Sequence, residues 1–185
     1  PGRNVLGQPL QIVNSDPTLH NVNCKPTKSK PFNIAQPTKG MKTTKQFTAV
    51  DVVSRWSVAT VASNATAVLA CQALDALVAR TPFPVRAIQI DGGSEFMADF
   101  ELACKARGIL LFELPPRSPK LNGRVERLNR TYREEFYDCS NAPPTVAGFR
   151  PALLAWEQTY NTVRPHQALG YLTPREFLDA WNLAH

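Results

Sequence analysis

Hydrophobic residues follow two kinds of pattern along this chain. In the first kind, short runs rich in β-branched and aromatic residues are bounded by polar, glycine or proline positions, which is typical of strands. Only Ser54 and Arg55 separate the second and third of these runs, so we expect them to form an antiparallel hairpin. The expected strands cover residues 9–13 (PLQIV), 46–53 (QFTAVDVV), 56–62 (WSVATVA), 85–90 (VRAIQI) and 109–114 (ILLFEL).

In the second kind of pattern, apolar residues recur every three or four positions, which is the period of an amphipathic helix. The predicted helices cover residues 65–80, 98–107, 124–137, 146–160 and 174–181. The segment 115–123 (PPRSPKLNG) contains three prolines and a glycine, so we expect it to lack regular structure. Strands that give way to alternating helices and strands predict an α/β fold, a mixed sheet with helices packed on it.

Composition narrows the class of protein. A chain of 185 residues with 43% hydrophobic residues is long enough for one compact domain with a core. No stretch approaches the roughly 18 consecutive apolar residues of a membrane span, so we expect a cytoplasmic protein that does not interact with membranes. Its four cysteines lie far apart without a C-x-x-C pair, which argues against a zinc cage or a disulfide scaffold.

Basic residues are concentrated in two regions of a chain whose formal net charge is +6. Residues 1–45 form a Pro- and Lys-rich arm with seven basic residues and one acid, Asp16, whereas residues 46–185 hold fourteen residues of each sign. The second basic region runs from residue 105 to residue 133 and holds eight basic residues against two acids. Such a distribution favours an anionic partner, although a solvated helix face is the alternative for a charge run.

Two acids, Asp91 and Glu126, are candidates for chemistry on a phosphodiester. Asp91 follows the expected strand 85–90 and precedes two glycines, and Glu126 lies near the start of a basic helix. Carboxylates hold Mg²⁺ while leaving positions for phosphate oxygens and water. Structural roles are the alternative, because Asp-Gly is a common turn and Glu126 stands four residues before Arg130.

The residues around these acids predict a DNA-binding surface. Glu126, Arg130 and Arg133 share one helical face by their spacing. Asn122 and Gly123 suit close approach of a sugar-phosphate backbone. The candidate DNA-binding residues are Arg117, Lys120, Asn122, Gly123, Arg124, Arg127, Arg130 and Arg133.

Three sequence blocks, IQIDGGSEF, LPPRSPKLNGRVERLNRTYREEF and YNTVRPHQALGYLTPREF, carry a resemblance to a known family. Residues 46 to about 183 resemble the catalytic core of retroviral integrases and bacterial insertion-sequence transposases, the DDE recombinases. The resemblance implies a ribonuclease H-like mixed sheet with flanking helices and a helical C-terminal extension. It also implies that Asp91 and Glu126 are the second and third acids of a metal-binding triad, and that residues 118–123 form a flexible active-site loop that touches DNA.

The activity that the resemblance implies is cutting and joining of DNA by a homo-oligomer that uses Mg²⁺ or Mn²⁺. A metal-activated water cuts a strand at the element's end, and the freed 3′-hydroxyl then attacks target DNA. The family carries its first acid in the first strand, and here the candidates are Asp16 and Asp51, or a first acid that has been lost or replaced. The alternatives are therefore an inactive DNA-binding remnant of a mobile element or a metal-dependent nuclease on the same fold. Because the sequence begins at Pro1, a preceding DNA-binding domain also stays open.

Overall fold

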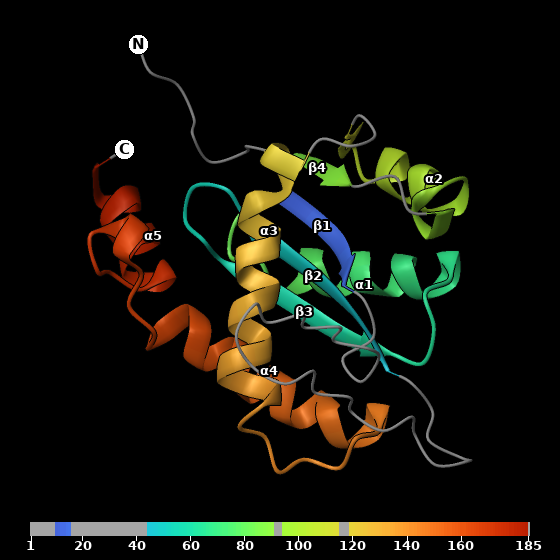
Figure 1. The fold of residues 1–185 in the computed structure, drawn as a ribbon. Helices are drawn as coiled ribbons and strands as arrows, with labels where there is room; N and C mark the ends of the chain where they lie inside the picture. The colour runs from blue at the N-terminus through green and yellow to red at the C-terminus, as the bar shows by residue number, and fades with distance from the viewer. Residues whose placement is uncertain (1–9, 16–43, 91–93, 115–118, 185) are drawn as a thin grey trace.

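The structure, a computed structural model, describes residues 10–15, 44–90, 94–114 and 119–184. Five strands form one mixed sheet in the order β3-β2-β1-β4-β5 (Figure 1). β2 runs antiparallel to both β1 and β3, whereas β4 runs parallel to both β1 and β5. The predicted mixed sheet is confirmed, with β1 at its centre. The strands are β1 (Leu10–Ser15), β2 (Lys45–Asp51), β3 (Ser57–Ala62), β4 (Ala87–Ile90) and β5 (Leu110–Glu113).

Five α-helices cover the sheet, close to the segments that the periodicity predicts. Two of them begin at a threonine whose hydroxyl accepts a hydrogen bond from a backbone N–H of the first turn, Thr66 from Leu69 and Thr145 from Gly148. A π-helical segment, η2 (Tyr132–Tyr137), continues α3. The helices are α1 (Ala67–Arg80), α2 (Asp99–Ala106), α3 (Pro119–Thr131), α4 (Val146–Thr162) and α5 (Pro174–Ala184), with short 3₁₀ turns η1 (Ser94–Phe96) and η3 (Gln167–Leu169).

The start of α3 corrects the prediction that residues 115–123 lack regular structure. Residues 119–123 are helical, and α3 begins at Pro119, five residues before the expected start. Proline suits the first helical position because no intrahelical partner awaits its missing N–H. Glycine in a helix interior is less stable than alanine by about 1 kcal/mol of helix free energy. The packing of the rest of α3 offsets this cost at Gly123. Residues 115–118 lie outside the described part of the chain.

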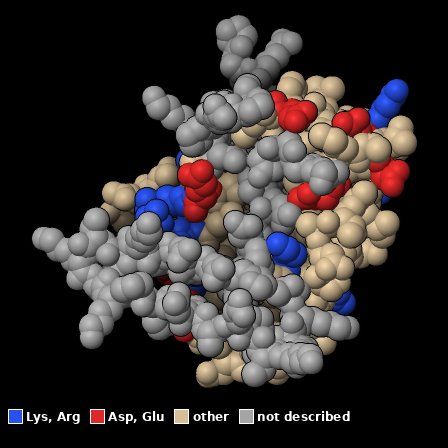
Figure 2. Space-filling view, turned by 45° about the vertical axis from the view of Figure 1, so that its right-hand side comes forward, with Lys and Arg blue, Asp and Glu red and all other residues tan. Residues whose placement is uncertain are grey.

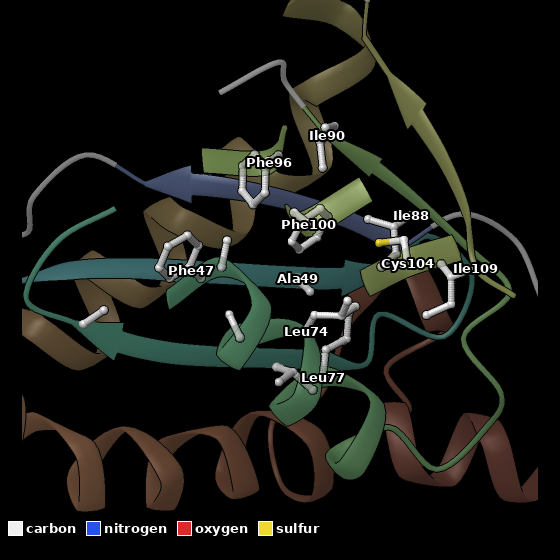
Figure 3. Packing of buried hydrophobic residues seen from close by; sticks show 14 of the residues in the cluster. Phe47, Ala49, Leu74, Leu77, Ile88, Ile90, Phe96, Phe100, Cys104 and Ile109 are labelled. Carbon is white, nitrogen blue, oxygen red and sulfur yellow. The ribbon is translucent and has the colours of Figure 1, made fainter. Parts of the chain in front are cut away.

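One hydrophobic core lies between the sheet and the helices α1 and α2. On β2, Phe47 and Ala49 point to this side, where they meet Leu74 of α1 and Phe100 of α2 (Figure 3). Phe100 also packs edge-to-face on Phe96, with ring centroids 5.1 Å apart. The alternate residues of β2 point to the opposite face, as the two-residue period of a strand requires.

A second core lies on that opposite face, under α3 and α4. Val50 of β2 packs there with Val125, Leu128 and Tyr132, which lie on one side of α3 and its π-helical continuation. Their spacing of three and four residues places them on a single helical face. α3 thereby lies across β1 and β2, and Figure 1 shows it crossing the sheet.

One edge of the sheet, strand β3, is covered by side chains of α4 and α1. The Asn161 side chain accepts a hydrogen bond from the Ser57 N–H at 2.9 Å and donates one to the Ser57 carbonyl at 2.8 Å. Two residues along, Glu157 accepts from the Ala59 N–H at 2.8 Å, and Arg80 donates to the Ala59 carbonyl at 3.1 Å. Arg80 and Glu157 also form an ion pair at 2.9 Å. These contacts satisfy backbone groups that an edge strand otherwise leaves unpaired.

Glu157 gives this edge a predicted pH dependence. Burial raises the pKa of its carboxyl from 4.5 to about 6, against the opposing effect of Arg80. A carboxyl with a raised folded pKa favours folding most below its unfolded pKa, and this contribution is lost as pH rises through the folded pKa. Because Glu157→Gln keeps an oxygen acceptor and does not ionise, we expect the wild type to lose about 2 kcal/mol of unfolding free energy relative to this variant between pH 4 and pH 7.

Urea unfolding of both proteins at several pH values measures this difference. Glu101→Gln, which changes an exposed carboxyl of α2, serves as the matched control. A difference between wild type and Glu157→Gln that stays constant across this range would contradict the prediction.

Candidate active site and nucleic-acid interface

Strands β1 and β4 are parallel neighbours at the centre of the sheet. Ile12 of β1 pairs with Ile90, the last residue of β4. In the sequence, Asp91 follows Ile90 directly, and Asp16 follows Ser15, the last residue of β1. The carboxyl ends of both strands therefore lie at the same edge of the sheet, where catalytic groups of α/β proteins commonly gather. Asp16 and Asp91 themselves lie outside the described residues.

Glu126 is exposed on α3, the helix that packs against β1 and β2. Its neighbours Val125 and Leu128 are buried against the sheet, so Glu126 lies on a different face of the helix. Within the described ranges, the Glu126 carboxylate forms no hydrogen bond or ion pair, and the pair with Arg130 that its spacing allows is not formed. An exposed carboxylate that no described residue binds suits a ligand.

Asp51 has a different environment from Glu126. Asp51 is buried, with only 3% of its surface exposed. Its Oδ2 accepts hydrogen bonds from the Ser54 N–H at 2.6 Å, the Ser54 hydroxyl at 2.7 Å and the Val53 N–H at 3.2 Å. Asp51 pairs with Leu10, which in turn pairs with Ile88. The register does not bring Asp51 to the carboxyl end of β4, and its carboxylate stabilises the β2–β3 turn.

The expected DNA-binding residues that the structure describes lie on α3 and η2. Gly123 is exposed, and a Cβ added there would meet no atom within 4 Å. The side chains of Lys120 and Asn122 and the whole of Arg117 lie outside the described part of the structure. Figure 2 shows a compact group of Lys and Arg side chains at the left of one face, with an acidic group beside it and further acidic groups at the upper right. The exposed arginines of α3 and η2 are Arg124, Arg127, Arg130 and Arg133.

One arginine near α3 is absent from the sequence-based predictions. Arg55 lies in the β2–β3 turn with φ +63°, a left-handed conformation that non-glycine residues adopt rarely. The VDVVSRW block signals a tight turn, but nothing in the sequence shows that this turn faces α3. The proximity of Arg55 to Arg124 emerges only from the folded structure.

The metal ligands expected from the sequence are Asp91, Glu126 and either Asp16 or Asp51. In the described ranges, no three His, Cys, Asp or Glu side chains converge to hold a metal ion. Glu126 fits the role of a ligand because it is exposed and its hard oxygen atoms form no hydrogen bond or ion pair with the residues that the structure describes.

A cavity of about 1010 Å³ lies elsewhere in the described part of the chain, between β3, α1 and α4. Its lining is mostly apolar and includes Leu69, Ala73 and Leu154. Arg80 reaches it but is already paired with Glu157. The described lining includes no Asp or Glu, so this cavity offers no carboxylates to hold a metal ion for phosphodiester chemistry.

Known structures share this fold. The catalytic core domain of BIV integrase is 23% identical to this chain with a TM-score of 0.63, and the match covers 95% of this chain and 96% of that one. A chain of a simian T-cell lymphotropic virus intasome, solved in complex with PP2A regulatory subunit B56 gamma, is 20% identical with a TM-score of 0.67, and the match covers 95% of this chain and 55% of that one. The expected ribonuclease H-like class of the retroviral integrase cores is thus confirmed.

Two family models described as "Integrase core domain" match residues 27–119 and 107–174. The chain therefore belongs to the integrase core domain family, and the resemblance to DDE integrases and transposases is confirmed. Within the described ranges, none of the helices combines the length and apolar character needed to cross a membrane.

Relatives from bacterial insertion elements align over part of the chain. An uncharacterized 31.7 kDa protein of insertion element IS407 from Burkholderia multivorans is 35% identical over 109 residues, which are 57% of this chain and 38% of that protein. Transposase InsD for insertion element IS2D from Escherichia coli is 36% identical over 62 residues, which are 34% of this chain and 20% of that protein. The chain thus spans well under half the length of these relatives.

Proposed function

We propose that this chain is the catalytic core of a DNA transposase or integrase that cuts and joins DNA strands with Mg²⁺ or Mn²⁺. The observation that supports this most directly is Glu126, an exposed carboxylate on the helix that packs against β1 and β2, with no hydrogen bond or ion pair among the described residues. The family to which the chain belongs acts in DNA integration and transposition, and this agrees with a helix α3 that carries several exposed arginines and an exposed acid.

The proposed metal ligands are Glu126, Asp91 and, as the first acid, Asp16. Asp91 directly follows β4 in the sequence and Asp16 directly follows β1, and these two strands are parallel neighbours. Asp51 is not proposed as a ligand because its carboxylate already accepts three hydrogen bonds in the β2–β3 turn. A bound divalent ion would stabilise negative charge on the attacking and leaving oxygens of the phosphodiester.

The arginines of α3 and η2 would perform the binding part of the reaction. Carboxylates alone repel DNA, so exposed cations beside Glu126 are needed to hold the phosphates. Arg130 and Arg133 would bind the strand near Glu126, since residues four and seven positions later lie on the same helical side. Joining two ends to a target also favours a homo-oligomer that assembles on DNA.

A metal titration with two DNA substrates tests the proposal. The chain is incubated with a labelled duplex carrying a free 3′-hydroxyl and with supercoiled plasmid, at increasing MgCl₂ or MnCl₂ and with EDTA as the control. Metal-dependent joining of the label to the plasmid is the expected result. Cleavage without joining would instead identify a nuclease, and salt-sensitive DNA binding without either product would identify an inactive remnant.

A further inference from the structure

A basic pocket of about 370 Å³ lies beside α3, on the side of the β2–β3 turn. Three segments far apart in the sequence form its wall: the turn at Arg55, residues 123–131 of α3, and the C-terminal block around Arg164 and His166. On α3 the lining side chains belong to Arg124, Arg127, Leu128 and Thr131, and Gly123 adds an open stretch of backbone.

The turn holds Arg55 in a fixed position at this pocket. Its backbone N–H donates to the Asp51 carbonyl at 3.1 Å, and the Asp51 N–H donates to the Trp56 carbonyl at 2.8 Å. Trp56 is buried, and the Arg175 guanidinium of α5 stacks 5.1 Å from its ring centroid. A left-handed arginine persists only when its surroundings determine the conformation, and such positions concentrate at functional sites.

The pocket contains more positive charge than the protein neutralises. Among the described residues, the guanidinium groups of Arg55, Arg124 and Arg127 form no hydrogen bond or ion pair. Arg164 differs, because its Nε donates to Glu135 Oε2 at 2.7 Å. The lining includes no acidic residue.

The electrostatics of Arg55 agree with this imbalance. Burial lowers the pKa of its guanidinium, the nearby Arg124 lowers it further, and Tyr160 and Asp51 act in the opposite direction. Asp51 does not neutralise the group directly, since its Oδ2 is bonded within the turn. Cations gathered without an internal counterion are the arrangement that a bound anion stabilises.

We propose that Arg55, Arg124 and Arg127 together bind a backbone phosphate of DNA in this pocket, at a point separate from Glu126. Residues two positions apart in an α-helix differ by roughly 200° around its axis, so Arg124 and Glu126 face opposite sides of α3. The pocket would therefore hold DNA without contributing to the metal site. The identification of the bound phosphate as part of DNA rests on the proposed function.

Salt-dependent binding of a fluorescent 20-base-pair duplex, without metal, tests the pocket. Arg55→Asn suits the left-handed position, and we expect it to bind roughly eightfold more weakly at 0.1 M salt and to reduce the slope of log K against log salt by about 0.9. Arg127→Gln should have a similar effect. Because both arginines hold the same phosphate, the double variant should lose clearly less than the sum of the two.

Arg86→Asn is the matched control, because this exposed arginine directly precedes β4 at the end of the strand opposite to Asp91. Melting temperatures verify that each variant folds, and Arg124→Gln replaces Arg55→Asn if that variant does not. The proposal would be overturned if the salt slopes of Arg55→Asn and Arg127→Gln equalled that of Arg86→Asn. It would also be overturned if the affinity loss of the double variant equalled the sum of the two single losses. If inorganic phosphate at millimolar concentration raises the melting temperature of the wild type but not of Arg127→Gln, while the DNA slopes stay unchanged, the site binds a free anion and the DNA proposal is overturned.

The two proposals fail separately. If metal-dependent joining is not observed but DNA binding still depends on Arg55, the proposed catalytic function fails and the phosphate-binding pocket stands. If joining proceeds but replacement of Arg55 or Arg127 does not change the salt slope, the phosphate-binding pocket fails and the proposed catalytic function stands.

Discussion

Replacement of Asp91 by Asn, or of Glu126 by Gln, is expected to reduce metal-dependent DNA cleavage and joining by about three orders of magnitude. Each change removes a charged oxygen ligand while keeping the shape of the side chain. Loss of several kcal/mol of charge stabilisation by a metal ion corresponds to a reduction of this size. DNA affinity should stay unchanged or rise, since a negative charge near the phosphates is removed. Gel analysis of labelled strands and fluorescence anisotropy measure the two quantities.

Controls for charge are available on the same surface elements. Glu134→Gln changes an exposed acid of η2, and Asp99→Asn changes an exposed acid of α2, so both remove one charge without affecting a proposed ligand. Both should leave joining within a few-fold of wild type. Asp16→Asn should behave like Asp91→Asn if Asp16 is the first acid. Full activity of Glu126→Gln would exclude Glu126 as a ligand.

Replacement of Phe100 by Ala is expected to cost about 3–5 kcal/mol of unfolding free energy, the largest stability effect that we predict. Phe100 is 0% exposed, and it links α2 to the core on β2 and α1 while packing on Phe96. Truncation would remove apolar contacts and leave a cavity that the rigid sheet cannot close. Urea unfolding monitored by circular dichroism measures the change.

Phe112→Ala is the matched control for this loss. Phe112 of β5 is 48% exposed, so the same truncation removes far less buried surface. We expect this variant to lose about 1 kcal/mol or less. Equal losses at both positions would show that Phe100 is not held in a rigid core.

Most secondary structure was predictable because the signals are local. The alternation in residues 46–62 and the helical spacing of Leu74 and Leu77 need no knowledge of distant partners. The start of α3 was not predictable in this way, since Pro119 and Gly123 ordinarily mark a loop. Packing of Val125 and Leu128 on the sheet stabilises the whole helix, including residues with poor intrinsic propensity.

The candidate site was predictable to a smaller extent. Motifs predict Asp91 and Glu126 as metal ligands, because a carboxylate after a buried strand and another in a basic helix are visible in the sequence, and this role stays a prediction. The role of Asp51 was not visible, since it depends on hydrogen bonds within one turn. Arg55 was also missed, because its position depends on how the β2–β3 turn packs against α3 and the C-terminal block.

The central position of β1 has a consequence for how the chain folds. In the strand order, β1 alone joins the β2–β3 hairpin to the parallel pair of β4 and β5. It reaches β2 across 29 intervening residues, 16 to 44. Closing so long a connection costs chain entropy that the hairpin and α1 do not incur, so β1 should insert after they have formed. A fragment truncated to begin at residue 46 would lack this junction and be left with two disconnected pairs of strands.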